Sequence, residues 1–115
     1  MVDDIAAALG LAPRHYKVVM DVLEKYVADR PVWAFGSRAF GQARPYSDLD
    51  LAIGGNGPLS AATTYQLIDA FDDSMLPIEV DVIDLNNVDA EFRRRVEPDF
   101  LLLQGGQGEV RLDAA

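Results

Sequence analysis

The sequence has no cysteine and no long apolar run. The absence of cysteine excludes disulfide frameworks, thiolate zinc sites and cysteine nucleophiles. No segment approaches the ~20 consecutive apolar residues that a membrane-spanning helix needs. The first ten residues, MVDDIAAALG, carry acids where a signal peptide carries Lys or Arg. We therefore expect a cytoplasmic protein that does not bind membranes.

Basic side chains are also scarce. Ten Lys and Arg stand against 19 Asp and Glu, and the formal net charge at pH 7 is −9. This charge opposes direct binding to the phosphate backbone of nucleic acid and favours encounter with a basic protein surface. Three of the arginines are consecutive, at Arg93–Arg95, and are interpreted as a solvated helix face. We expect no direct contact with nucleic acid.

The length of 115 residues, with half of them apolar and a quarter charged, is typical of one compact domain. A domain of this size buries roughly two thirds of the surface that its unfolded chain exposes, which is enough to fold without disulfides. No internal repeat or interdomain linker is visible in the sequence. We expect a single domain over residues 1–115.

Apolar residues recur at helical spacing in three segments, and short apolar or alternating runs mark three strands. The helices are expected over residues 13–28, 61–75 and 88–97, and the strands near residues 31–35, 49–53 and 78–83. Ser60 is a plausible N-cap of the second helix, whose apolar stripe comprises Ala61, Tyr65, Ile68, Phe71 and Met75. Residues 100–104 are too few to assign by period, and residues 105–115 are expected to form a mobile tail or a final edge strand.

Two of the strands carry carboxylates on one face. Alternation over residues 48–53 places Asp48 and Asp50 on the face opposite the leucines, and Asp81 has the same place on the third strand. At ~4 Å and an effective dielectric constant near 20, each pair of ionised carboxylates costs on the order of 4 kcal/mol. Mg²⁺ would offset this repulsion, and two ions roughly 3.5–4 Å apart suit phosphoryl chemistry. Taken alone, such a pair of acids is usually a solvated strand face.

A second feature lies just upstream. Gly36 and Ser37 follow the first strand, and a Gly-Ser turn at this place brings backbone N–H groups and a hydroxyl to an anion. The GxxxxGK[ST] pattern is missing, so this turn is not a P-loop.

Gly36-Ser37, followed by ten residues and then Asp48-Leu49-Asp50, resembles the GS-x10-DxD signature of the polymerase β-like nucleotidyltransferases. The run GSRAFGQARPYSDLDLAI is most similar to the minimal nucleotidyltransferase (MNT) group, the antitoxin half of HEPN–MNT toxin–antitoxin pairs. The resemblance implies an α/β (α+β) fold, with a short mixed sheet packed on helices and its acidic face open to nucleotide.

By this resemblance Asp48 and Asp50 hold the metal ions, and Asp81 completes the catalytic triad. Gly36 and Ser37 hold the triphosphate of the nucleotide. The resemblance also assigns phosphate contacts to the two arginines of the motif, Arg38 and Arg44. Ser47, directly before Asp48, is grouped with the nucleotide-binding residues, although it also suits the closing of a turn. Phe40 stands where many relatives have a second arginine, which removes one possible phosphate contact.

The implied activity is transfer of AMP from ATP, with Mg²⁺ in two sites, to a hydroxyl of a HEPN ribonuclease toxin, a tyrosine being expected. A chain of this length has no residues left for an acceptor-binding domain, so the acceptor is expected on another macromolecule. Two alternatives remain open: an antitoxin that neutralises the toxin by binding alone, and a small-molecule nucleotidyltransferase of the aminoglycoside type. Replacing Asp48 and Asp50 by Asn separates catalysis from binding, because the change removes charge and keeps shape.

Overall fold

The computed structural model describes residues 2–41 and 43–105, so the expectation for residues 105–115 lies outside it except at Gly105. Four strands form one sheet in the order β3-β2-β1-β4, with β2 parallel to β3 and β1 antiparallel to both β2 and β4. The strands are β1 (Val32–Phe35), β2 (Leu49–Ile53), β3 (Val80–Asp84) and β4 (Leu101–Gln104). The mixed sheet confirms the expected α/β class.

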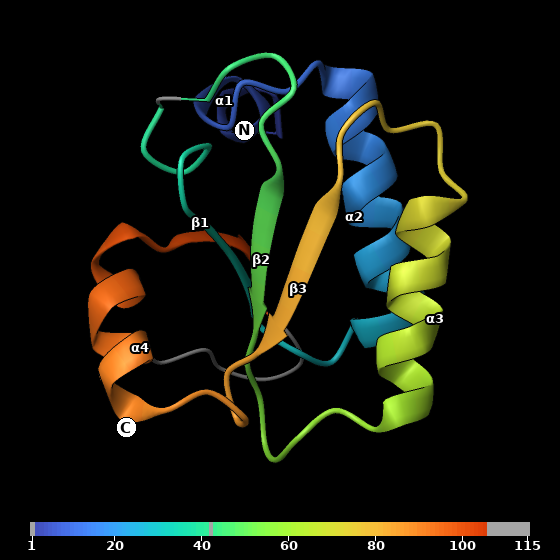
Figure 1. The fold of residues 1–115 in the computed structure, drawn as a ribbon. Coiled ribbons are helices and arrows are strands. Elements are labelled where there is room, and N and C mark those ends of the chain that lie inside the picture. Colours follow the sequence, from blue (N-terminus) through green and yellow to red (C-terminus); the bar gives the residue numbers. More distant parts are fainter. Residues whose placement is uncertain (1, 42, 106–115) are drawn as a thin grey trace.

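Helices cover both faces of this sheet (Figure 1). The helices are α1 (Val2–Ala8), α2 (Pro13–Val27), α3 (Ala61–Asp72) and α4 (Ala90–Val96), and a 3-10 turn, η1 (Glu97–Asp99), follows α4. Helices α2 and α3 lie side by side on one face, and α4 lies on the other (Figure 1). In the described part of the chain, no helix combines the length and the apolar content needed to cross a membrane.

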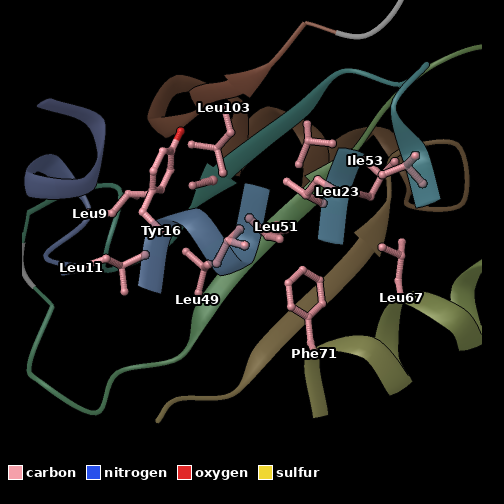
Figure 2. Close-up of a cluster of buried hydrophobic side chains, with 14 of the residues drawn as sticks. Leu9, Leu11, Tyr16, Leu23, Leu49, Leu51, Ile53, Leu67, Phe71 and Leu103 are labelled. Carbon is pink, nitrogen blue, oxygen red and sulfur yellow. The ribbon is translucent and has the colours of Figure 1, made fainter. Parts of the chain in front are cut away.

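The core forms between the sheet and the pair α2 and α3. Leu49, Leu51 and Ile53 alternate along β2 and are fully buried, because this strand turns every second side chain toward the helices. Figure 2 shows them gathered with Leu23 of α2 and with Phe71 of α3. The expected orientation of the β2 pattern is therefore confirmed, and the other side chains of β2 point to the opposite face.

The opposite face holds a smaller apolar cluster under α4. Its buried members are Trp33, Ala52 and Leu85, with Phe35, Ile83, Val88 and Phe100 packed against them. Ala52 and Ile83 of this cluster lie in the later part of β2 and β3. The start of both strands lies at one common end, because the strands are parallel, and that end of the face carries Asp50 and Asp81.

The structure differs from the sequence-based expectation in three places. Helix α1 and strand β4 were not expected, although β4 uses the unassigned residues 100–104. Helix α3 has Ser60 as its N-cap, as expected, with the hydroxyl accepting from the Thr63 N–H at 3.0 Å, but it ends at Asp72. The expected apolar stripe of α3 was wrong as a core stripe, since α3 buries Leu67 and Phe71. Four members of that stripe are exposed, namely Ala61, Tyr65, Ile68 and Met75.

Candidate active site

The three carboxylates of the motif meet at the start of β2 and β3. Asp50 and Asp81 are direct partners in the parallel register, so their side chains leave neighbouring strands on the same face. Asp48 stands just before β2 and is exposed, as is Asp81, while Asp50 is partly buried. The structure thus brings together the three acids that the alternating patterns predicted.

The electrostatics of Asp50 record this proximity. Burial raises the pKa of the Asp50 carboxyl above its ordinary value of 3.8, and the negative charges of Asp81 and Asp48 raise it further. A side-chain hydrogen bond with Asp81 acts in the same direction. The ionised form of Asp50 is therefore disfavoured by its surroundings, and a bound cation would stabilise it.

The glycine of the Gly-Ser turn is required by this carboxylate. Gly36 has φ +77°, and a Cβ atom at this position would collide with the Asp50 carboxylate. Phe35, the residue before it, is the cross-strand partner of Asp50, which explains the close approach. Ser37, the next residue, is exposed, so the turn that carries it lies close to the Asp50 carboxylate through Gly36. The phosphate-holding role expected for this turn stays a prediction.

The Arg38 side chain does not take the phosphate-contacting role expected for it, because its guanidinium is buried. Its side chain is only 1% exposed, and all five of its N–H groups donate to backbone carbonyls at 2.9–3.4 Å. The acceptors are the carbonyls of Leu9, Gly10, Arg44, Pro45 and Ser47. The guanidinium therefore has no N–H left for a phosphate. It joins the α1–α2 turn to the segment that leads into Asp48.

Ser47 and Arg44, the other two expected nucleotide-binding residues of that segment, differ in their contacts. The Ser47 hydroxyl accepts a hydrogen bond from the Arg44 N–H at 2.9 Å, and the Ser47 N–H donates to the Arg44 carbonyl at 3.0 Å. Ser47 thus closes a turn, the second of the two roles its sequence position suits. Arg44 is exposed and makes no ion pair within the described residues, so its guanidinium is available to an anion.

The oxygen donors fit a hard cation that arrives with its substrate. Among residues 2–41 and 43–105, no three His, Asp or Glu side chains are already gathered as a closed metal-binding set. Mg²⁺ is usually held by one or two carboxylates together with substrate phosphates and water, rather than by a protein cage. Asp50 with Asp81 or Asp48, next to an exposed turn that suits phosphate, is such a partial set.

Helix α4 adds a contact that sequence reasoning missed. The Phe92 ring meets the Phe35 ring edge-on, with the centroids 6.3 Å apart, and Phe35 shares its sheet face with Asp50. The Arg95 guanidinium lies 5.6 Å from the centroid of Phe92. Arg94 and Arg95 are exposed, as expected of a solvated face, whereas Arg93 is half-buried and pairs with Glu97 at 2.9 Å. The contact between Phe92 and Phe35 joins segments far apart in the chain, so the sequence alone could not reveal it.

Comparison with known proteins agrees with this geometry. The family model described as "Polymerase beta, Nucleotidyltransferase" matches residues 17–103, a span that includes the Gly-Ser turn and all three carboxylates. A Haemophilus influenzae protein named "Probable protein adenylyltransferase MntA" is 38% identical over 109 residues. The alignment covers 95% of this chain and 96% of that relative.

Solved structures share the fold at lower identity. A crystal structure of a toxin–antitoxin with AMP-PNP matches with a TM-score of 0.65 and 23% identity, over 79% of this chain and 73% of the other. A mutant of the toxin–antitoxin MntA–HpeT matches with a TM-score of 0.63 and 22% identity, over the same shares. At this identity the likeness concerns the fold. The family model and the relative that matches over almost its whole length show that this chain belongs to the polymerase β nucleotidyltransferase family.

Proposed function

We propose that the chain is a cytoplasmic antitoxin that transfers AMP from ATP to a tyrosine hydroxyl of a HEPN-type ribonuclease toxin. One observation carries the proposal: Asp50 and Asp81 are register partners, with Asp48 beside them and the Gly36 backbone against the Asp50 carboxylate. The relative named as a protein adenylyltransferase supports the reaction, and the toxin–antitoxin structures support the kind of partner.

Each residue of the site has a task in this proposal. Asp48, Asp50 and Asp81 would hold Mg²⁺, with two ions expected, and bound magnesium supplies positive charge that offsets the charge of the phosphates. Gly36 and Ser37 hold the triphosphate through the N–H groups and the hydroxyl of the turn. Arg38 is left out of the nucleotide-binding set because its donors are all occupied. Arg44 remains as the cation that reaches the phosphates.

The proposed reaction is an in-line displacement at the α-phosphorus of ATP. The hydroxyl oxygen of the toxin forms a bond to this phosphorus while the bond to the oxygen that bridges the α- and β-phosphorus breaks, and pyrophosphate leaves. Asp81, exposed on the edge strand β3, accepts the hydroxyl proton. The attached AMP brings a phosphate charge to the toxin, which disfavours RNA there by like-charge repulsion.

Intact-protein mass spectrometry of the purified toxin tests the proposal. The toxin is incubated with the chain, ATP and Mg²⁺, beside the double variant Asp48→Asn, Asp50→Asn. The matched control is Asp21→Asn, Asp29→Asn, which removes the same charge from exposed positions in and just after α2. The unaltered chain and the control should add one or more AMP units to the toxin, and the Asp48, Asp50 variant should add none.

The same samples separate the two alternatives. A stable complex without any mass gain, together with toxin neutralisation by the Asp48, Asp50 variant in cells, would favour an antitoxin that acts by binding alone. Transfer of AMP to an aminoglycoside in the absence of the toxin would favour the small-molecule enzyme. Either result would overturn the proposed function.

A further inference from the structure

The outer face of α3 is apolar and uncovered within the described chain. Tyr65 is 68% exposed and Ile68 is 41% exposed, and both point away from the core that Leu67 and Phe71 enter. Met75, just after the helix, is 74% exposed. Scattered apolar side chains are ordinary on a protein surface, but Tyr65 and Ile68, three residues apart, share one face of α3, and Met75 adds exposed apolar area beyond its C-terminal end. Exposed apolar side chains that lie together are typical of an interaction site. We call Tyr65, Ile68 and Met75 the α3 stripe.

Acidic side chains border the α3 stripe. Asp69, Asp72 and Asp73 are exposed, and none makes an ion pair with a cation of residues 2–41 and 43–105. They lie in the last turn and at the C-cap of α3, where the helix dipole is negative and where α3 has no basic residue. Acids at this end of a helix are unfavourable by a few tenths of a kcal/mol or more each. The described contacts therefore show no contribution of these three acids to the stability of the fold.

This charge decides which occupant suits the stripe. If a second copy of the chain docked here, its Asp69, Asp72 and Asp73 would lie against the same three acids of the first copy. Each copy also carries a net charge of −9, so the two would repel each other. Nucleic acid and an anionic membrane surface would be repelled for the same reason. A protein surface with apolar side chains flanked by Lys or Arg matches both parts of the stripe, and the opposite charges would also steer its approach.

The stripe leads to the reactive end of the molecule. Helix α3 packs against β3, which is an edge strand of the sheet, and the segment after Asp72 passes Met75 on its way to the start of β3. Figure 1 shows this segment at the same end as the start of β2. Asp48 precedes β2 at that end, and Asp81 is exposed near the start of β3. The carboxylates lie on the face of the sheet opposite to α3, and the edge strand β3, with its exposed Asp81, separates the two. A protein docked on α3 would therefore reach the carboxylates around the β3 edge.

We propose that the α3 stripe is the docking surface for the acceptor protein, which contacts it through an apolar patch flanked by basic residues. This inference rests on the proposed function, since it concerns how the toxin is presented to the site. Binding energy used at a distance from the reacting atoms positions the hydroxyl for attack.

The test measures toxin binding and steady-state AMP transfer for two stripe variants. The first is Asp69→Lys, Asp72→Lys, which reverses the charge at the end of α3 and improves the match with the helix dipole, so the variant should fold. The second is Tyr65→Ser, Met75→Ser, which removes exposed apolar area without changing charge. The matched control for the first is Glu24→Lys, Asp29→Lys, the same change in net charge at exposed positions in and just after α2.

We expect the dissociation constant for the purified HEPN-type toxin to rise about tenfold or more in both stripe variants, and to change little in the control. The KM for toxin should rise in parallel, while the KM for ATP and the kcat at saturating toxin stay unchanged. Raising the salt concentration should weaken toxin binding by the unaltered chain and have less effect on the Asp69, Asp72 variant.

Failure of this inference differs from failure of the proposed function. If the unaltered chain transfers AMP to the toxin and both stripe variants bind and react like the control, the docking site lies elsewhere and the proposed function stands. If the unaltered chain binds the toxin without transferring AMP, the proposed function fails, and the binding measurements still decide the role of the stripe. Self-association through the stripe, seen as a dimer in sedimentation that the Tyr65, Met75 variant loses, would also overturn the inference.

Discussion

The guanidinium Nε of Arg38 donates a 2.9 Å hydrogen bond to the carbonyl of Ser47, the residue that directly precedes Asp48. The same side chain donates to the carbonyls of Leu9 and Gly10 at 3.0 and 3.1 Å, in the turn between α1 and α2. Burial lowers the pKa of Arg38, and the charge of Asp48 acts in the opposite direction. Arg38 thus fixes the approach of the chain to Asp48, the first of the three carboxylates of the candidate site.

We predict that Arg38→Ala destabilises the fold by about 3 kcal/mol or more, because it leaves buried carbonyls without donors. Urea unfolding measures this loss. Arg38→Lys should recover part of the stability, since a lysine reaches fewer of the carbonyls. Ser37→Ala, one residue earlier and exposed, is the control and should leave stability nearly unchanged. If Arg38→Lys had unchanged stability and a much higher KM for ATP, the result would contradict this prediction and support the phosphate contact expected from the sequence.

Gly36 and Gly41 allow the carboxylate contact to be separated from backbone strain. Their φ angles are +77° and +75°, so alanine at either position has a similar backbone cost of about 1–2 kcal/mol. Only at Gly36 would the added Cβ collide with Asp50, because nothing lies within 4 Å of a Cβ at Gly41. Gly36→Ala should therefore lower AMP transfer far more than Gly41→Ala at a similar loss of stability. Equal activities of the two variants would contradict the proposed fit between turn and carboxylate.

The raised pKa of Asp50 predicts a gain in stability when its charge is removed. In the folded state this carboxyl holds its proton to a higher pH than its ordinary value of 3.8. The folded state therefore binds more protons than the unfolded state above that pH, and the free energy of unfolding falls as the pH rises through the raised pKa. Asp50→Asn removes this penalty. In EDTA at pH 7 the variant should be more stable than the unaltered chain, although it is inactive.

The pH dependence provides the control for Asp50→Asn. The stability difference between variant and unaltered chain should shrink as the pH is lowered through 3.8, because below that pH the carboxyl is protonated in both states. Thermal unfolding at a series of pH values measures it. A difference that does not depend on pH would mean that packing, and not charge, explains the gain. An Asp50→Asn protein less stable than the unaltered chain at pH 7 would contradict the electrostatic reading.

The strands that carry the carboxylates could be predicted because their pattern is local. Alternation in β2 and β3 fixes which side chains face the helices, so Asp50 and Asp81 follow from the leucines and valines beside them. Strand β4 could not be assigned, because Leu101, Leu102 and Leu103 have no period, and its place comes from pairing with β1, remote in sequence. Helix α1 is also set by tertiary contacts, with Ala6 of the helix and Leu9 just after it buried in the core.

Side-chain roles were harder to predict than strands. The position of Arg38 in the motif suggests a phosphate contact, and only the fold shows that five carbonyls surround its guanidinium. The apolar residues of α3 recur at helical spacing on more than one face of the helix. Their period alone does not say which face meets the sheet. Leu67 and Phe71 occupy the buried face, which leaves Tyr65 and Ile68 outside. Both errors concern contacts between segments far apart in the chain.

Strand β3 carries two aspartates with opposite tasks. Asp81 is exposed beside Asp50, whereas Asp84 accepts hydrogen bonds from the Leu59 N–H at 2.7 Å and from the Asn86 N–H at 2.9 Å. Asp84 therefore anchors the loop that leads from β2 to α3 and has no place among the reacting groups. The same substitution, Asp to Asn, should separate the two roles within one strand.

We predict that Asp84→Asn lowers the free energy of unfolding by about 1–3 kcal/mol, because one backbone donor loses its charged acceptor, while AMP transfer by the folded protein persists. Asp81→Asn should keep or raise stability, since it removes a charge that opposes the ionisation of Asp50. It should lower AMP transfer about a hundredfold or more, as expected for a group that stabilises phosphoryl charge by several kcal/mol. Urea unfolding and toxin mass spectrometry on the same preparations measure both effects. If Asp84→Asn abolished transfer at unchanged stability, the catalytic carboxylate of β3 would be Asp84 and the assignment of Asp81 would be wrong.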